Sequence, residues 1–216
     1  MGRHVVDLAL LLSTQAGHDP RAPLSLSTDP AIFTHDLNTE VRGQRVGWLG
    51  DLKGYLPTEP GVLDACQAGL QRLQTMGCEI EETQLNMAPE QVWQTWLAWR
   101  KVLVAGRLAP LMQNPANRAC IKPEAVWEYD QGQGVSASQF MDAIVQRTSF
   151  YHGMLKLFER YDVLALPSAQ VWPFDKNIRW PQEIKTANGS VSMDTYHRWM
   201  EVVIYATLAG LPSISV

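Results

Sequence analysis

Three residues near the C-terminal end of the sequence have the side chains that serine hydrolysis requires. Ser192, Asp194 and His197 lie close together in the chain. In such chemistry a histidine accepts the proton of the serine hydroxyl, and a carboxylate orients the histidine. Triads are assembled from distant segments, however, and a helix beginning near Asp194 turns His197 to the polar side that carries Arg198 and Glu201. The sequence therefore predicts a solvated His197, and an independent hydrolase that uses His197 is kept as an alternative hypothesis.

The other histidines and the cysteines show no metal-ligand pattern. The histidines outside this segment, whose spacing is not that of a metal site, are His4, His18, His35 and His152. The cysteines, which are odd in number and include no C-x-x-C pair, are Cys66, Cys78 and Cys120. Such cysteines are typical of structural thiols in a reducing cytoplasm. The sequence thus predicts no metal, no cofactor and a cytoplasmic location.

The elements that must position these side chains are strands and a helix. Residues 162–167 and 213–216 are short apolar runs, typical of strands buried on both faces of a sheet. Between them, residues 194–209 repeat apolar side chains at three- and four-residue steps, which predicts one continuous helix that begins at Asp194 and stops at Gly210. A strand, helix and strand in this order predict a parallel pair with helices on the sheet faces.

The remaining patterns extend this α/β interpretation over the whole chain. Helices are predicted at 5–16, 60–76, 89–109, 123–129 and 137–160, the last with a capping box at 136–139. Strands are predicted at 45–49 and, near a sheet edge, at 78–85, which makes residues 45–85 a βαβ unit. Residues 114–122 and 171–193 are predicted loops, with a hairpin turn at Asn188-Gly189 in the second. The fold class is therefore α/β, a mixed sheet with flanking helices, and no linker divides residues 1–216.

Composition excludes several functional classes. The 216 residues are 46% hydrophobic and 19% charged, as in an ordinary soluble globular protein. A formal charge of −4 and a pI near 5.7 argue against nucleic acid or an anionic membrane as a partner. The apolar run at 5–12 is too short to cross a bilayer.

Several segments, in order, resemble the amidase signature family. The segments that carry the resemblance are MGRHVVDLALLL at 1–12, GQRVGW at 43–48, YDVLALPS at 161–168 and YATLAGLPSISV at 205–216. In the family these motifs follow the catalytic core, so the resemblance implies a partial amidase-signature fold. On this interpretation residues 1–216 are a single incomplete domain, the C-terminal part of an amidase.

The resemblance implies amide chemistry but assigns no catalytic residue to this chain. The family uses a Ser–Ser–Lys triad whose nucleophile lies in a Gly-Gly-Ser-Ser stretch. No Gly-Gly pair occurs here, and no lysine lies in a matching motif. The chain is therefore expected to be inactive by itself, as the substrate-pocket portion of a metal-independent enzyme that cleaves carboxylic amide bonds. The alternative is a non-catalytic ligand- or partner-binding protein of the same fold.

The resemblance also implies which residues line the acyl pocket. The candidate substrate-binding residues, from the loop 168–173, the segment after Asp194 and the helix at 123–129, are Ser168, Trp172, Tyr196, Trp199, Met200 and Trp127. Met200 occupies the position where members that bind glutamine or glutamyl groups carry an acid, so a neutral or apolar acyl group is expected. The alternative is that Trp199 and Met200 belong to the core. The expected partners are a small-molecule amide substrate in the full-length enzyme and other copies of the chain, through an exposed sheet edge.

Overall fold

The computed structural model describes residues 2–216 and separates into two compact units, Met1–Val41 and Arg42–Val216. The first unit holds helix α1 (Val5–Gln15) and a short 3-10 helix (Pro30–Thr34), which pack on each other. Leu11 and Leu12, both in the apolar run of this helix, are exposed. The buried residue of α1 is instead Ala9, because the apolar run of α1 covers more of the helix than one face can bury.

The second unit contains a three-stranded parallel sheet in the order β2-β1-β3. Its strands are β1 (Arg45–Trp48), β2 (Glu79–Glu82) and β3 (Val163–Ala165). Val46 pairs with Ile80 on one side and with Val163 on the other, so β1 is the central strand and its apolar residues are buried. Helix α2 (Val62–Thr75) connects β1 to β2, which confirms the predicted βαβ unit and the edge position of the acidic strand.

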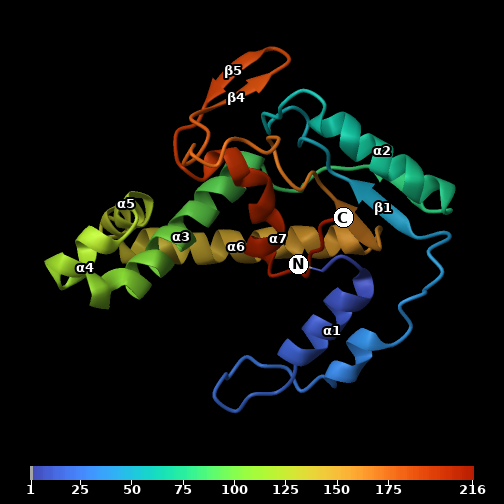
Figure 1. Ribbon diagram of the computed structural model, residues 1–216, viewed down its shortest axis with the longest axis horizontal. Coiled ribbons are helices and arrows are strands. Elements are labelled where there is room, and N and C mark those ends of the chain that lie inside the picture. The colour runs from blue at the N-terminus through green and yellow to red at the C-terminus, as the bar shows by residue number, and fades with distance from the viewer. Residues whose placement is uncertain (1) are drawn as a thin grey trace. The chain divides into compact units, whose positions relative to one another are not determined.

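Helices α3 (Pro89–Met112), α5 (Pro123–Gly132) and α6 (Ala137–Phe158) form the largest helical packing of this unit. Figure 1 shows α3 crossing α6, with α5 packed on α3. The predicted capping box of α6 is present, because the Ser136 hydroxyl accepts from Gln139 N and the Gln139 side chain accepts from Ser136 N. On α6, Tyr151 and Leu155 are exposed, whereas Phe150 is buried.

Two boundaries in the helical region differ from prediction. Pro110 lies inside α3 rather than beyond its end. A proline lacks the N–H that would bond the carbonyl four residues earlier, and here that carbonyl belongs to Gly106, which is exposed to water. The predicted loop at 114–122 contains helix α4 (Pro115–Cys120), which Asn114 caps by accepting from Ala116 N.

The last segment departs most from prediction. The expected continuous helix at 194–209 is divided into a 3-10 helix, η2 (Arg198–Val203), and helix α7 (Ile204–Ala209), with non-helical backbone at Met200. Gly210 ends α7 in the left-handed conformation, as predicted. Residues 213–216 form no strand, and β3 pairs with β1 instead. Pro212 provides no ladder donor there, and Ile214 is 65% exposed.

The predicted loop at 171–193 contains a two-stranded hairpin. Strands β4 (Glu183–Thr186) and β5 (Gly189–Ser192) pair antiparallel, with Thr186 opposite Gly189. The hairpin turn lies at 187–188, one residue before the predicted Asn188-Gly189, and Gly189 begins β5 with a φ of +126°. Ile184 is fully buried with Val171 and Met193 in a small cluster apart from the main core. The strands are short and largely polar, so periodicity alone did not indicate them. No helix within residues 2–216 has the length and apolar character needed to cross a membrane.

Candidate functional site

The segment 194–203 carries three of the predicted binding residues, and its backbone is irregular. Residues 194–197 form bends and turns, η2 follows, and Met200 has φ −120° and ψ 24° inside it. A 3-10 turn with such a kink has few helical hydrogen bonds of its own. The conformation of this segment must therefore be held by side-chain contacts, and two networks, each built around a buried carboxylate, supply them.

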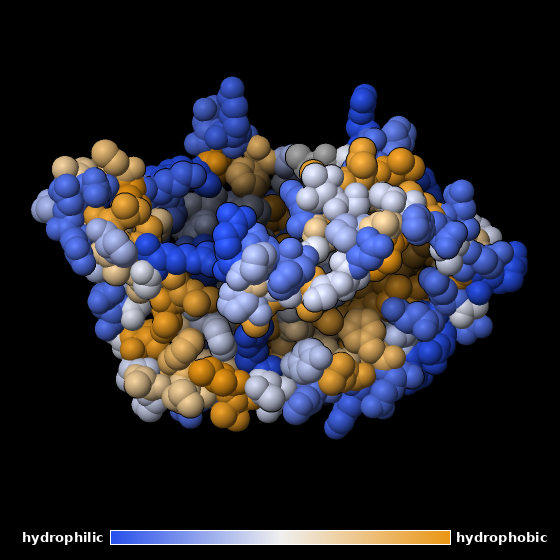
Figure 2. All heavy atoms as spheres, turned by 90° about the horizontal axis from the view of Figure 1, so that it is seen from below, coloured by the Kyte–Doolittle hydropathy of each residue, from blue (hydrophilic) through white to orange (hydrophobic). Residues whose placement is uncertain are grey.

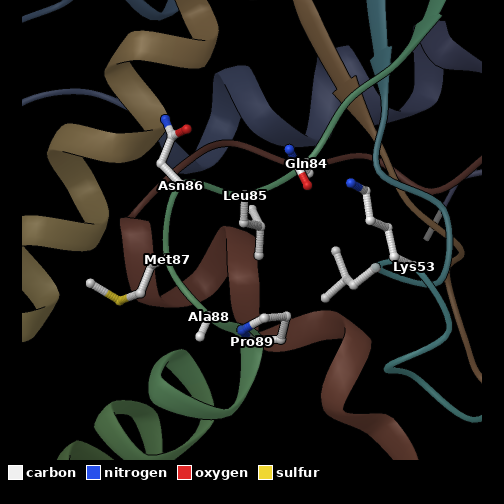
Figure 3. Close-up of a pocket in the computed structure, with 8 residues that line it drawn as sticks. Lys53, Gln84, Leu85, Asn86, Met87, Ala88 and Pro89 are labelled. Carbon is white, nitrogen blue, oxygen red and sulfur yellow. The ribbon is translucent and has the colours of Figure 1, made fainter.

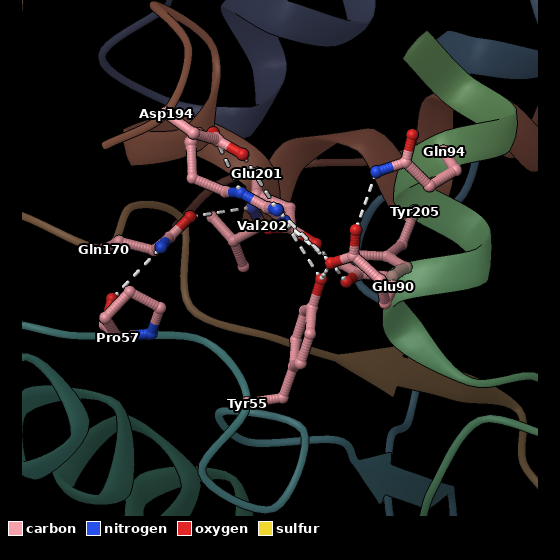
Figure 4. A network of polar contacts seen from close by, with 10 residues as sticks. Tyr55, Pro57, Glu90, Gln94, Gln170, Asp194, Glu201, Val202 and Tyr205 are labelled. Carbon is pink, nitrogen blue, oxygen red and sulfur yellow. Dashed lines mark hydrogen bonds and ion pairs between the residues drawn. The ribbon is translucent and has the colours of Figure 1, made fainter. Parts of the chain in front are cut away.

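The first network is centred on Arg198. Its guanidinium donates to Glu201 Oε2 at 2.9 Å, to the Tyr55 hydroxyl at 3.0 Å and to Glu90 Oε2 at 3.2 Å. It also bonds both carboxylate oxygens of Asp194 at 3.3 Å. Figure 4 shows these partners converging from the loop after β1, the start of α3 and the segment around η2. This set of contacts, the Arg198 network, joins η2 to two other elements.

Burial and charge act in opposite directions within the Arg198 network. Glu201 is 1% exposed, and burial raises the pKa of its carboxyl, although Arg198 opposes the effect. Burial alone would also raise the pKa of Glu90, but hydrogen bonds from Gln94 and Tyr55 and the charge of Arg198 lower it. The Arg198 guanidinium stacks over Trp93, 4.4 Å from the ring centroid. One cation thus compensates several carboxylates, so Arg198 is the residue on which the network depends.

Gln170 extends these contacts to the loop 168–173, which carries two of the predicted binding residues. Its side chain is fully buried, donates to the Pro57 carbonyl at 3.0 Å and accepts from Val202 N at 3.1 Å. Figure 4 shows this amide bridging the two backbone segments. Because a buried amide without partners is costly, these bonds fix the loop 168–173 against η2.

The second network is centred on Glu128 of α5. Its carboxylate accepts from Arg100 Nε at 2.7 Å and Nη2 at 3.1 Å, and Glu128 Oε1 lies 2.9 Å from His197 Nε2. Glu128 is 2% exposed and His197 1%. Burial alone would raise the pKa of Glu128, but the hydrogen bonds from His197 and Arg100 outweigh it and lower the pKa. This Glu128 network holds the first turn of the segment against α5.

The prediction of a solvated His197 is wrong. A helical wheel started at Asp194 assigned it to the polar side, but residues 194–197 are not helical, so that phase does not apply. Glu201, placed on the same polar side, is buried as well. Among the contacts of residues 2–216, the hydrogen-bond partner of His197 is Glu128, whereas Asp194 bonds Arg198. The structure therefore does not assemble the sequence-local triad.

Aromatic rings surround the His197 imidazole. Tyr196 lies 4.1 Å from it between ring centroids, Trp96 lies 5.2 Å away edge-on, and Trp127 lies 6.5 Å away. Trp127 is also part of the lining of a cavity of about 580 Å³ between α4 and α5, together with Arg118 and Asp130. The structure thus brings two predicted binding residues, Trp127 and Tyr196, to the same buried group.

The other predicted binding residues lie in separate surroundings. Trp199 packs against the Val171–Ile184–Met193 cluster and edge-on to Phe174, 5.4 Å away, which agrees with the alternative that it belongs to a core. Trp172 donates through its ring N–H to the Pro60 carbonyl and through its backbone N–H to Glu59. Among the ring pairs of residues 2–216, neither tryptophan is paired with a ring around His197.

Ser168 and Met200 also lie apart from the rings around His197 in their ring and hydrogen-bond contacts. The Ser168 hydroxyl lies 2.8 Å from that of Ser215, at an exposed position. Met200 is half-buried at the kink of η2. Sequence patterns indicated neither Gln170 nor the partners Arg100 and Glu128. The only local signal for the two partners was a charged residue within each aromatic-rich helix segment, beside Trp99 and Trp127.

The fold is that of the amidase-signature enzymes. A bacterial aryl acylamidase of that family superimposes with a TM-score of 0.77 at 22% identity, covering 96% of this chain and 43% of the acylamidase. A 6-aminohexanoate cyclic dimer hydrolase gives a TM-score of 0.73 at 15% identity, with 97% and 45% coverage. The sequence profile of the Amidase family matches residues 1–216, and the chain therefore belongs to the amidase family.

Curated relatives agree with this assignment. A glutamyl-tRNA(Gln) amidotransferase subunit from Synechococcus sp. (strain JA-2-3B'a(2-13)) is 30% identical over an alignment of 188 positions, which covers 77% of this chain and 36% of that protein. An amidase from Pseudomonas putida is 24% identical over 215 residues, 99% of this chain and 44% of that protein. The chain thus spans less than half the length of these relatives.

Proposed function

We propose that this chain forms the substrate-pocket portion of an amidase-signature hydrolase that cleaves carboxylic amide bonds. The observation that supports it is the double anchoring of the segment 194–203. The Arg198 network and the Glu128 network hold an irregular backbone in place on both sides of Tyr196, Trp199 and Met200. A wall that positions a substrate needs this kind of support from buried partners.

The catalytic groups are proposed to come from residues outside this sequence, so that the chain alone is inactive. Two facts support this. The sequence has no Gly-Gly-Ser-Ser stretch, and its relatives are more than twice as long as the part that it matches. Helix α6 also carries exposed apolar side chains at helical spacing, which are Met141, Val145 and Leu155. Such a face suits packing against a further segment.

The substrate is proposed to have a neutral or apolar acyl group. Met200 offers a thioether rather than a carboxylate at the kink of η2, and a thioether cannot pair with a substrate ammonium. The carboxylates nearest in sequence, Asp194 and Glu201, are both engaged by Arg198. A cationic substrate therefore finds no free charge in this part of the wall.

An amidase assay with and without a supplied N-terminal segment tests the proposal. The chain is assayed on an anilide of a simple acid, alone and co-expressed with the part of the aryl acylamidase that it does not match. Activity is expected only in the combination. In that combination Met200→Asp should lower anilide turnover and raise turnover of a glutamine amide, whereas Met76→Asp, at an exposed position outside the segment, should change neither. Hydrolysis by the chain alone would contradict the proposal that the catalytic groups lie outside this sequence.

A non-catalytic ligand-binding protein of the same fold is the second candidate. It is favoured by a pocket beside Lys53, described below, which involves none of the segment 194–203. Failure of every combination to turn over an amide, with binding retained at that pocket, would favour this candidate.

A cytoplasmic location is likewise inferred from composition only.

Self-association through a sheet edge is part of the same proposal. The outer side of β3 is an unpaired edge among the described strands, and Val163 on it is 46% exposed. Apolar side chains also reach the surface on the face that Figure 2 shows. Light scattering at rising concentration should show oligomers, and Val163→Lys should reduce them. A monodisperse monomer at high concentration would exclude association.

A further inference from the structure

A pocket of about 280 Å³ lies where the chain leaves two neighbouring parallel strands. Leu52 and Lys53, a few residues after β1, line one side. The segment 84–89, which follows β2, lines the other. Because the carboxyl ends of parallel strands open at the same edge of a sheet, ligand pockets are common in this position. Its volume suits a molecule smaller than a typical drug.

Both walls of this pocket are held by specific hydrogen bonds. The Tyr55 hydroxyl donates to Glu90 Oε2 at 2.8 Å and so ties the loop after β1 to the start of α3. The Asn86 amide donates to the Gly153 carbonyl at 3.1 Å and ties the segment 84–89 to α6. The pocket is therefore part of the fixed structure rather than a gap between loops.

The wall after β1 has an unusual backbone. Leu52 and Lys53 have φ values of +57° and +61°, a region that side-chain-bearing residues rarely adopt. Asp51 stabilises this turn by accepting from Gly54 N at 2.8 Å. Leu52 is directed into the core, where it is 8% exposed, and Lys53 is exposed. The consecutive left-handed residues thus bury the leucine while leaving the lysine at the pocket.

The polar groups of the pocket gather at one end. Figure 3 shows the Lys53 ammonium and the Gln84 amide at the same end, with Leu85 and Pro89 along the remaining wall. Among the contacts of residues 2–216, neither the Lys53 ammonium nor the Gln84 side chain has a hydrogen bond or ion pair. A single cation beside one amide donor matches a monoanion, and the apolar wall matches a short hydrocarbon body.

We propose that this pocket binds a small organic carboxylate, with the carboxylate on Lys53 and Gln84 and the apolar body against Leu52, Leu85 and Pro89. The proposal does not depend on catalysis, because binding is measured without turnover. It also involves none of the residues 194–203, so its failure and that of the proposed function are distinguishable.

The test uses hexanoate, with hexanamide and hexylammonium as probes of the same chain length but different charge. Backbone amide signals of the ¹⁵N-labelled full chain are followed during titration. Hexanoate should shift the signals of Lys53 and Leu85, and should bind about five-fold more tightly than hexanamide, the ratio that one partly exposed ion pair supports. Hexylammonium should bind no better than hexanamide. The preference for hexanoate should decrease as salt rises.

Variants locate the effect. Lys53→Met should remove the preference for hexanoate, Lys53→Arg should retain it, and Lys156→Met, at an exposed position on α6, should leave it unchanged. Far-ultraviolet circular dichroism checks that each variant folds. The proposal is overturned if hexanoate leaves the Lys53 and Leu85 signals unmoved, if the three probes bind equally, or if Lys53→Met keeps the preference.

Discussion

Replacing Glu128 by glutamine removes the charge that joins α5 to Arg100 and His197. The substitution keeps the size and shape of the side chain, so packing changes little. What is lost is the bidentate pair with Arg100 and the charge-assisted contact with His197 Nε2. Glutamine can accept only one set of these hydrogen bonds, because its second terminal atom is a donor. The amide oxygen can still contact Arg100 Nη2 and His197 Nε2, as Oε1 does now, but the amide NH2 cannot accept from Arg100 Nε.

The magnitude follows from burial. Removing one partner of a fully buried ion pair costs about 3–5 kcal/mol. The Arg100 side chain is 38% exposed, so water solvates part of its charge in the variant. We therefore expect Glu128→Gln to lower the free energy of unfolding by about 2–3 kcal/mol, after this discount for screening. For a chain of this size that corresponds to a decrease in Tm of roughly 5–10 °C.

A matched control lies on the same helix. Asp130 also accepts two hydrogen bonds from one arginine, Arg118, at 3.1 and 2.7 Å, but both side chains are more than 40% exposed. Asp130→Asn should therefore cost less than about 1 kcal/mol. Urea unfolding followed by circular dichroism, with thermal melts in parallel, measures both variants. Equal losses in the two would refute the claim that burial makes the Glu128 network important.

The wild type and Glu128→Gln should also differ in how their free energy of unfolding depends on pH. The folded-state pKa of Glu128 lies below the ordinary value, so the unfolded chain binds the proton more readily than the folded one. The stabilisation is complete at neutral pH and is lost as pH falls below about 4, through the folded-state pKa. The difference in the free energy of unfolding between the wild type and Glu128→Gln should therefore decrease in that pH range. A difference that grows on acidification would contradict the assigned direction.

Two further substitutions test the backbone and the helix packing. Gly132→Ala places a methyl group 2.4 Å from the Lys101 carbonyl oxygen and should lower the free energy of unfolding by about 1–3 kcal/mol. Gly106→Ala, with open space around it, should raise the free energy of unfolding by up to about 1 kcal/mol. Urea unfolding midpoints measure both variants, and equal effects would contradict the close approach of α3 and α5. Lys53→Gly should raise the free energy of unfolding by roughly 0.5 kcal/mol, because glycine adopts the left-handed backbone conformation without strain. Lys156→Gly, inside α6, should lower the free energy of unfolding by about 1 kcal/mol. A loss of stability in both variants would argue against strain at Lys53.

Features that depend on neighbours in the chain were predictable from the sequence. The capping box at 136–139 closes within four residues, and the hairpin turn, one residue before the predicted Asn188-Gly189, is followed by Gly189 with a φ of +126°. The βαβ unit from 45 to 85 shows clear periods in each element, and β2 carries the acids of an edge strand. The resemblance of short ordered segments to the amidase family was confirmed by the family match over residues 1–216.

Features that depend on distant partners were not predictable from the sequence. Residues 213–216 have the composition of a strand, yet a strand must also pair with a neighbour, and these residues form no ladder although the outer side of β3 is unpaired. Pro110 is accommodated in α3 where the carbonyl that it leaves without a helical partner belongs to an exposed residue, Gly106. Neither outcome can be read from local pattern, since each depends on what surrounds the segment.

The candidate site shows the same division most clearly. Sequence alone identified the segment after Asp194 and its aromatic residues, because their types and the family motifs are local. Only the tertiary structure decided that His197 is buried, since its partner Glu128 is 69 positions away and Arg100 lies a further 28 before that. A helical wheel assumes a regular helix, and here ion pairs from other elements impose a different backbone. The side chains are determined by sequence, whereas the environment that sets their charge and burial is determined by packing.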